Sequence, residues 1–262
     1  MLPKPKKSLG QNFLLDKNIQ RKIAAACDIS DSDTVLEIGP GTGAITGLLA
    51  RKARQVFAVE IDTALCETLT SGLKTYPNLS IINADILKTD IRRFSAGSGQ
   101  KIKVVGNIPY YITTPIIERL LEYRDMIRSV YLTVQKEFGQ RMAAAPGSKE
   151  YGRLSCFVRY YTEPAVLFLI KKNSFTPAPK VDSCFLRLTV RARPAVTVGD
   201  EERFFRIIRA SFQQRRKTLA NSLKGMVSRE HLQAFFSRYS IDPRIRPERL
   251  SLQDFAHLAN IV

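Results

Sequence analysis

The sequence predicts an α/β fold: a mainly parallel β-sheet with helices on both faces, followed by a small helical domain. Two observations support this fold class. Through the first half of the chain, short apolar segments alternate with amphipathic ones, which is typical of βαβ units. After about residue 195, apolar residues recur at helical spacing instead. We therefore expect one domain at residues 1–195 and a second at 196–262.

The elements of the first domain follow in order along the chain. Its predicted strands are 34–39, 55–61, 79–85, 102–107 and 129–135. Its predicted helices are 44–53, 63–74 and 114–123. In the second of these helices Leu65, Leu69 and Leu73 share one face, as expected for a helix that packs on a sheet.

The pattern changes in the second half of the chain. Residues 154–170 and 183–190 are rich in β-branched and aromatic residues, and we expect them to form the last strands of the sheet. A linker is expected at 191–200. Helical patterns follow at 201–212, 229–239 and 251–262. In the last of these, Ser251 and Asp254 have the spacing of a capping box.

Composition restricts the classes of function. The 262 residues contain 41 Lys and Arg against 24 Asp and Glu, a net charge of +17. Such an excess favours a polyanionic partner, nucleic acid before an anionic membrane surface. Four isolated cysteines and two histidines assemble no metal-ligand cluster and no histidine triad. Single cysteines suit a reducing cytoplasm, and no apolar run is long enough to span a bilayer.

Polar and glycine residues follow three of the predicted strands. Gly39, Gly41 and Gly43 occupy the first strand-to-helix turn, where backbone can approach a ligand closely. Glu60 ends the second strand, where an acid can hold ribose hydroxyls, and Asp85 ends the third, where it can hold an adenine amino group. A tight turn or a helix cap would explain each residue alone. Together they predict a site for an adenosine-bearing cofactor, and without a lysine after the glycines ATP is disfavoured.

The fourth strand ends in the turn "NIPY", residues 107–110. A proline ends a strand because it has no N–H for the ladder, so packing alone is one explanation. The alternative is a binding site at the carboxyl edge of the sheet.

Several segments resemble those of a known family. "EIGPGTG", "VEID", "NADIL" and "GNIPYYITTP" resemble motifs of S-adenosylmethionine-dependent adenine-N6 methyltransferases. "SLGQNFLLD", "FTPAPKVDSCFLRL" and "ASFQQRRKTLANSL" resemble signatures of the small-subunit ribosomal RNA adenine dimethyltransferases, so the resemblance covers nearly the whole chain. It implies a Rossmann-like class I methyltransferase sheet and S-adenosylmethionine as cofactor. The implied cofactor contacts are Asn12, Leu14, Gly39, Gly41, Glu60, Asp85 and Asn107.

The turn at 107–110 then has a chemical explanation. The exocyclic nitrogen of adenine is a poor nucleophile because its lone pair is delocalised into the ring. The Asn107 side-chain oxygen and the Ile108 carbonyl can accept its hydrogens and turn the lone pair toward the methyl group. Pro109 fixes the backbone around that carbonyl, and Tyr110 can stack on a flipped-out base. Catalysis is then mainly positioning, and it needs no strong general base.

Contacts to RNA are predicted at two further places. Phe175 is a candidate for the second face of the target base, with a buried loop aromatic as the alternative. Arg215, Arg216 and Lys217 interrupt the apolar stripe of the helix before them. We expect a helix break there with the three cations facing outward to RNA phosphates, although a salt-bridged loop would also fit.

The resemblance implies that the enzyme dimethylates N6 of two adjacent adenines in a loop near the 3′ end of small-subunit ribosomal RNA, as part of small-subunit biogenesis. Three alternatives stay open: the related dimethyltransferases of large-subunit RNA, a DNA adenine methyltransferase, and an assembly factor that only binds the ribosome. No metal and no membrane partner are expected. A monomer is favoured because no long apolar stripe is left unexplained.

Overall fold

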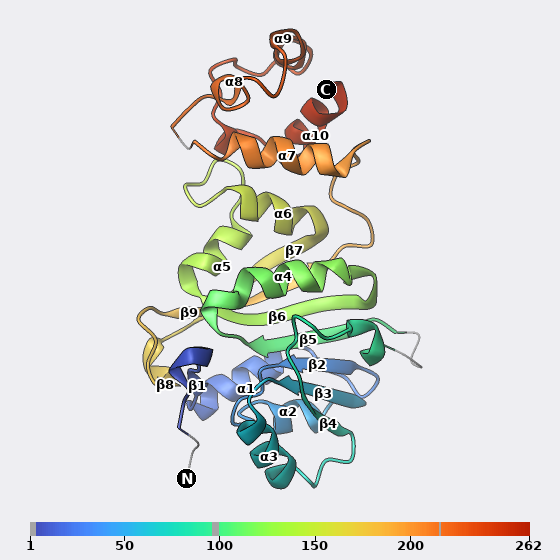
Figure 1. Cartoon of the computed structure of the whole chain (residues 1–262), viewed down its shortest axis with the longest axis vertical. Helices are drawn as coiled ribbons and strands as arrows, with labels where there is room; N and C mark the ends of the chain where they lie inside the picture. The colour runs from blue at the N-terminus through green and yellow to red at the C-terminus, as the bar shows by residue number, and fades with distance from the viewer. Residues whose placement is uncertain (1–3, 96–99, 215) are drawn as a thin grey trace. The chain divides into compact units, whose positions relative to one another are not determined.

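The computed structural model describes residues 4–95, 100–214 and 216–262, and it confirms the predicted fold class (Figure 1). Within these residues, seven strands form one sheet in the order β4-β3-β2-β5-β6-β9-β7. The strands are β2 (Thr34–Ile38), β3 (Gln55–Glu60), β4 (Leu79–Asn83), β5 (Ile102–Asn107), β6 (Ile127–Gln135), β7 (Thr162–Ile170) and β9 (Ser183–Val190). The pairs from β4 to β6 are parallel, and β9 runs antiparallel to β6.

The carboxyl ends of four parallel strands meet at one edge of this sheet. Ile38 at the end of β2 pairs with Val59 on one side and with Gly106 on the other. Glu60 at the end of β3 pairs with Asn83 at the end of β4. This register brings the polar residues that follow the strands to the same edge, as the sequence predicts.

Helices cover both faces of the parallel part of the sheet. They are α1 (Lys17–Ala26), α2 (Thr46–Ala50), α3 (Thr63–Gly72) and α4 (Thr113–Glu122). Ile23 of α1 and Leu49 of α2 share a core with Val35 and Val105 of the sheet. Successive strand residues point to opposite faces, so Val104, which is fully buried, faces the other side. The apolar stripe of α4, which lies in front of the sheet in Figure 1, consists of Ile116, Ile117, Leu120 and Leu121.

A two-stranded ribbon lies outside the main sheet. β1 (Phe13–Leu14) pairs antiparallel with β8 (Phe175–Thr176), and Leu14 lies opposite Phe175. The Asp16 side chain accepts from the N–H groups of Asn18 and Ile19 and so caps α1 directly after this ribbon. The N-terminal signature predicted to hold the cofactor is thereby fixed by backbone pairing.

The chain divides into two compact units, residues 1–139 with 165–190, and residues 140–164 with 191–262. The remaining helices are α5 (Lys136–Ala143), which begins in the first unit, and α6 (Arg153–Tyr161), α7 (Glu201–Ser211), α8 (Leu219–Ser222), α9 (Arg229–Arg238) and α10 (Leu252–Ile261) in the second. The second unit thus takes in 140–164, a stretch that the sequence analysis placed within 1–195.

Aromatic residues form much of the core of the second unit. Its ring contacts include Tyr160 with Phe204 at 5.1 Å between centroids, and Phe212 with Phe255 at 5.9 Å. The predicted capping box of Ser251 and Asp254 is confirmed at the start of α10.

The expected strand over 154–170 is wrong in its first half, because residues 153–161 form the helix α6. Cys156, Val158 and Tyr160 alternate with other residues, which is the pattern of a strand. All three are buried in α6, and so are Ser155 and Tyr161. The helix carries two charged residues, Arg153, which is exposed, and Arg159, which is partly buried, but the aromatic and β-branched residues between them favoured a strand. Only the second half of the segment, β7, joins the sheet.

No helix in the described part of the chain combines the length and apolarity needed to cross a bilayer. The four cysteines are unpaired and buried.

Candidate active site

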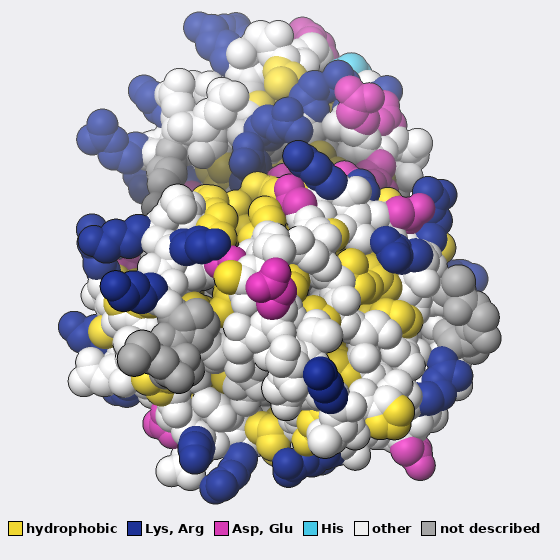
Figure 2. Space-filling model, turned by 60° about the horizontal axis from the view of Figure 1, so that its bottom comes forward, with side chains coloured by type: hydrophobic (Ala, Val, Ile, Leu, Met, Phe, Trp, Pro, Cys, Tyr) yellow, Lys and Arg dark blue, Asp and Glu magenta, His cyan; other side chains and the backbone are white. Residues whose placement is uncertain are grey.

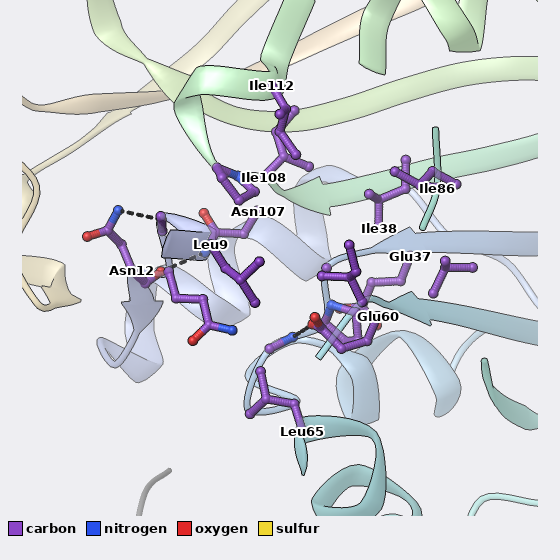
Figure 3. Close-up of a pocket in the computed structure, with 18 of the residues that line it drawn as sticks. Leu9, Asn12, Glu37, Ile38, Glu60, Leu65, Ile86, Asn107, Ile108 and Ile112 are labelled. Atoms are coloured by element: carbon purple, nitrogen blue, oxygen red, sulfur yellow. Dashed lines mark hydrogen bonds between the residues drawn. The ribbon is translucent and has the colours of Figure 1, made fainter. Parts of the chain in front are cut away.

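A pocket opens at the carboxyl edge of β2, β3 and β5, with the segment before α1 forming one of its walls (Figure 3). Its lining includes all the predicted cofactor and catalytic residues: Asn12, Leu14, Gly39, Gly41, Glu60, Asp85, Asn107, Ile108, Pro109 and Tyr110. These residues come from stretches up to about a hundred positions apart. The parallel register brings the residues that follow the strands together, and the N-terminal segment adds Asn12 and Leu14.

The glycine turn after β2 leaves backbone groups open to the pocket. Gly39 and Gly41 have φ values of +64° and +58°, a conformation that favours glycine. A Cβ on Gly39 would lie 3.8 Å from the Asn107 carbonyl oxygen, so the loop and the end of β5 nearly touch. Gly39 lines the pocket, and any other residue there would be strained by the positive φ.

Glu60 is held in place at the end of β3. Its Oε2 accepts from the Gly41 N–H at 3.1 Å, and its Oε1 accepts from the Asp62 N–H at 3.0 Å. The residue is only 5% exposed, and burial raises the pKa of its carboxyl. Carboxylate oxygens have further lone pairs, so this oriented group can still accept two neighbouring hydroxyls of a ribose.

The Asp85 side chain combines a structural contact with an oxygen that can face a ligand. Its Oδ1 accepts from the Leu87 N–H at 2.9 Å, which closes the turn after β4. Ile86, which is 7% exposed, lies beside it in the pocket wall and offers an apolar surface to an aromatic ring. Sequence reasoning missed Ile86, because an isoleucine after a strand carries no signal of its own.

The amide of Asn107 is oriented by the segment that crosses the pocket. Its Nδ2 donates to the Asn12 carbonyl oxygen at 3.2 Å, and the Asn12 side chain donates to the Gly10 carbonyl oxygen at the same distance. Because Nδ2 is engaged, Oδ1 is the atom of Asn107 left to accept a hydrogen bond from a ligand. A Cβ on Gly106 would lie 3.1 Å from the Ile38 carbonyl oxygen, so β5 ends in close contact with β2.

The turn after Asn107 presents two tyrosines. The Tyr110 hydroxyl lies 2.6 Å from Ser183 Oγ on β9, which fixes the half-buried ring, and burial raises the pKa of its phenol. Pro109 has φ −59° and leads into this turn. Tyr111 also lines the pocket and is 63% exposed. Sequence reasoning did not select Tyr111, because a second tyrosine at a helix start usually packs against its neighbours.

Glu37 is an ionisable residue of the pocket that sequence reasoning missed. It lies inside β2 and is 1% exposed, and within the described residues the side chain beside it that can donate a hydrogen bond is the hydroxyl of Thr46. Burial raises the pKa of its carboxyl to about 8 although the Thr46 hydroxyl lowers it, and repulsion from Glu60 acts in the same direction as burial. The signal was present as a lone acid within the apolar strand "TVLEI".

The predicted RNA-contacting residues lie elsewhere. Phe175 is 3% exposed and packs in the core with Leu14, and it is outside the pocket lining, so its role against the target base stays a prediction. The predicted helix break is confirmed: α7 ends at Ser211, and Arg216 and Lys217 are exposed before α8. Arg215 lies outside the described residues. Figure 2 shows one face of the molecule, on which Lys and Arg side chains are more abundant than Asp and Glu side chains.

No group of three or more His, Cys, Asp or Glu side chains within the described ranges could hold a metal ion.

The sheet order and the pocket at its carboxyl edge define a class I, Rossmann-like methyltransferase. A family model described as ribosomal RNA adenine dimethylase matches residues 3–262, and the chain belongs to this family. A curated relative, ribosomal RNA small subunit methyltransferase A of Geobacillus thermodenitrificans, is 47% identical over 97% of this chain and 90% of its own. The protein of the same name from Moorella thermoacetica is also 47% identical, over 97% and 91% of the two chains.

Solved structures agree with this assignment. A dimethyladenosine transferase from Plasmodium falciparum superposes with a TM-score of 0.81 at 27% identity, covering 94% of this chain and 95% of that one. The 23S rRNA methyltransferase ErmE superposes with a TM-score of 0.76 at 28% identity, covering 95% and 99%. The predicted family and fold class are confirmed.

The fold and the family imply that the enzyme uses S-adenosylmethionine, and the pocket fits that molecule. The positive-φ glycines leave space at the turn, and Glu60 offers an oriented acceptor for the ribose. The buried carboxyl of Glu37, which lines the pocket and has no cation beside it among the described residues, suits a ligand that carries positive charge, as S-adenosylmethionine does on its sulfonium and amino groups.

Proposed function

We propose that this protein dimethylates N6 of two adjacent adenines in a loop near the 3′ end of small-subunit ribosomal RNA, with S-adenosylmethionine as methyl donor. We also propose that it acts in the cytoplasm as a monomer. The observation that carries the chemistry is the amide of Asn107, whose Nδ2 is tied to Asn12 and whose Oδ1 is left for the substrate. The choice of RNA rests on the family and on its relatives named small subunit methyltransferase A.

The residues around the glycine turn bind the cofactor in this proposal. Glu60 accepts from the ribose hydroxyls, and Asp85 accepts from the adenine amino group with the oxygen that Leu87 does not use. Leu14 in β1 and Asn12 just before it enclose the methionine end, and the glycines leave room for it beside the backbone. When bound, S-adenosylmethionine supplies a methyl group on a positively charged sulfur.

The turn at residues 107–110 binds and orients the target base. Asn107 Oδ1 and the Ile108 carbonyl oxygen accept the two amino hydrogens, which turns the nitrogen lone pair toward the methyl group. Pro109 limits the motion of that carbonyl, and Tyr110, fixed through Ser183, stacks on the ring. The methylated nitrogen is acidic while it carries its extra proton and loses it to water. Holding this geometry before reaction removes much of the entropic barrier.

The second proposed role is RNA binding by the C-terminal residues 196–262. Arg216 and Lys217 are exposed in the break between α7 and α8, and neither makes an ion pair with a described carboxylate, which favours contact with RNA over a salt-bridged loop. With Arg215 they would neutralise RNA phosphates, as the net charge of +17 favours. Phe175 is a proposed contact for the target base that would need β8 to shift.

A substrate panel tests the proposal. The protein is incubated with labelled S-adenosylmethionine and undermethylated small subunits, with large subunits and duplex DNA as parallel substrates. We expect label in small-subunit RNA alone. Label only in large-subunit RNA or only in DNA would show that the enzyme acts on that nucleic acid and not on small-subunit RNA. Tight binding to small subunits without label would mean that the protein is a binding factor.

A further inference from the structure

Asp62, which follows the ribose-side acid Glu60 by two residues, is the centre of a hydrogen-bond cluster. Its side chain is 3% exposed, and its Oδ1 accepts from Lys6 Nζ at 2.7 Å. Its Oδ2 accepts from Gln11 Nε2 at 3.1 Å, and its own N–H donates to Glu60. The ammonium donor and the amide donor both come from the N-terminal segment, more than fifty residues away in sequence.

That segment, residues 6–12, passes across the pocket. Leu9, Gly10, Gln11 and Asn12 all contribute to the pocket lining. Gln11 also accepts the Lys6 N–H at 2.7 Å, so the two residues that reach Asp62 are joined to each other. At its far end the segment is held on the opposite side of the pocket, because the Asn12 carbonyl oxygen accepts from Asn107. The segment is therefore attached at both rims.

The charges at the Asp62 end favour a strong attachment. Hydrogen bonds between an ammonium and a carboxylate are stronger than those between neutral groups. The carboxylate of this pair is buried from solvent, which weakens screening of its charge. Lys6 is itself about half exposed, with a side-chain exposure of 52%, so water can solvate its ammonium group when the contact opens. Such an attachment is firm enough to hold the segment and weak enough to open.

We propose that Asp62 is a positioning residue that fastens residues 6–12 across the cofactor pocket through Lys6 and Gln11. The fastened segment places the Asn12 carbonyl against Asn107 and retards exchange of S-adenosylmethionine with solvent. The same aspartate supports Glu60, so closure of the segment and orientation of the ribose acceptor share one residue. This inference rests on the proposed cofactor site and adds to it a residue that controls cofactor retention.

Asp62 also has a structural role that the test has to separate. Its side chain caps α3 by accepting from the Ala64 N–H at 3.2 Å. In Asp62→Asn the amide oxygen can still cap the helix, while the charge and one acceptor are lost. In Lys6→Gln the aspartate is unchanged and only the ammonium is removed. Lys7→Gln is the matched control, because Lys7 is an exposed neighbour without an ion pair to any described carboxylate.

The first measurement is the dissociation rate of S-adenosylmethionine from the full-length protein, followed by displacement with excess S-adenosylhomocysteine. We expect Lys6→Gln and Asp62→Asn each to speed dissociation by about threefold to tenfold, as for the loss of a charged hydrogen bond that is partly solvated. The double variant should dissociate no faster than Asp62→Asn, because both changes remove one interaction. Lys7→Gln should match the wild type.

The second measurement is hydrogen exchange of the peptide covering residues 4–12 in protein without cofactor. We expect faster exchange in Lys6→Gln and in Asp62→Asn, with exchange in α3 unchanged. Unchanged dissociation and exchange in Lys6→Gln, or single effects that multiply in the double variant, would overturn the proposal. A wild-type protein that binds no S-adenosylmethionine would instead contradict the proposed function, whatever the exchange result.

Discussion

The side-chain amide of Asn107 uses its nitrogen for a hydrogen bond within the protein and leaves its oxygen to accept one from the substrate. Since Nδ2 donates to Asn12 at 3.2 Å, loss of the side chain removes the acceptor that would hold the adenine amino group. We predict that Asn107→Ala lowers kcat by about 10²–10³-fold, the usual cost of removing one positioned hydrogen-bonding group. Affinity for small subunits should stay at the wild-type value, measured by filter binding. Retained turnover would place the acceptor on another residue.

Glu37 makes stability depend on pH. Its folded-state pKa of about 8 lies above the ordinary 4.5, so between these values the folded chain holds a proton that the unfolded chain has lost. Without cofactor, the free energy of unfolding therefore falls as pH rises from about 4.5 to 8, by on the order of a few kcal/mol. Urea titrations at about pH 6 and about pH 9 measure the part of this fall that lies above pH 6.

Glu37→Gln provides the control for that dependence. A neutral amide of the same shape cannot titrate, so the variant should lose much less stability over the same pH interval than the wild type. S-adenosylmethionine should also bind this variant less tightly, because the carboxylate that faces its positive charge is gone. An identical pH dependence in wild type and variant would show that Glu37 is not the titrating group.

At the scale of elements, the end of β5 depends on close backbone contact. A Cβ on Gly106 would meet the Ile38 carbonyl oxygen at 3.1 Å and the Ile108 side chain at 3.0 Å. We predict that Gly106→Ala costs about 1–3 kcal/mol of stability, as overpacking does, and displaces Asn107 enough to lower kcat. Gly72→Ala, in α3 with nothing within 4 Å, should instead be neutral or stabilising. Thermal unfolding of both variants tests the contrast.

The type of a helix or strand was predictable where polar and apolar residues alternate at one clear period, and it was not predictable where two periods fit the sequence. The edge residues Gly39, Glu60 and Asp85 were found because they follow three successive predicted strands in an order that suits one ligand, although each residue alone has a structural explanation. α6 was mistaken for a strand because Cys156, Val158 and Tyr160 alternate as strand residues do, and aromatic and β-branched residues favour β-structure. Ile86 and the Lys6–Asp62 ion pair were out of reach because they depend on tertiary placement.

At the scale of the whole molecule, affinity for RNA should depend on exposed cations. We predict that Arg216→Gln combined with Lys217→Gln weakens binding to small subunits. The slope of log affinity against log salt should fall by about one unit for each phosphate that the variant no longer neutralises. A double variant of Lys224→Gln and Arg229→Gln removes the same charge from exposed residues of the same unit and serves as the control. Equal slopes for the two double variants would contradict a specific role for the α7–α8 break.

The chemical identity of the methylated nucleoside is the decisive measurement for the proposed reaction. Undermethylated small subunits are treated with the protein and S-adenosylmethionine, and the RNA is digested for mass spectrometry of its nucleosides. We predict N6,N6-dimethyladenosine, located at two adjacent adenines near the 3′ end, and far less of it with Asn107→Ala after the same reaction time. Methylation at a ring nitrogen, at a base other than adenine, or to the same extent with Asn107→Ala would contradict the proposed function.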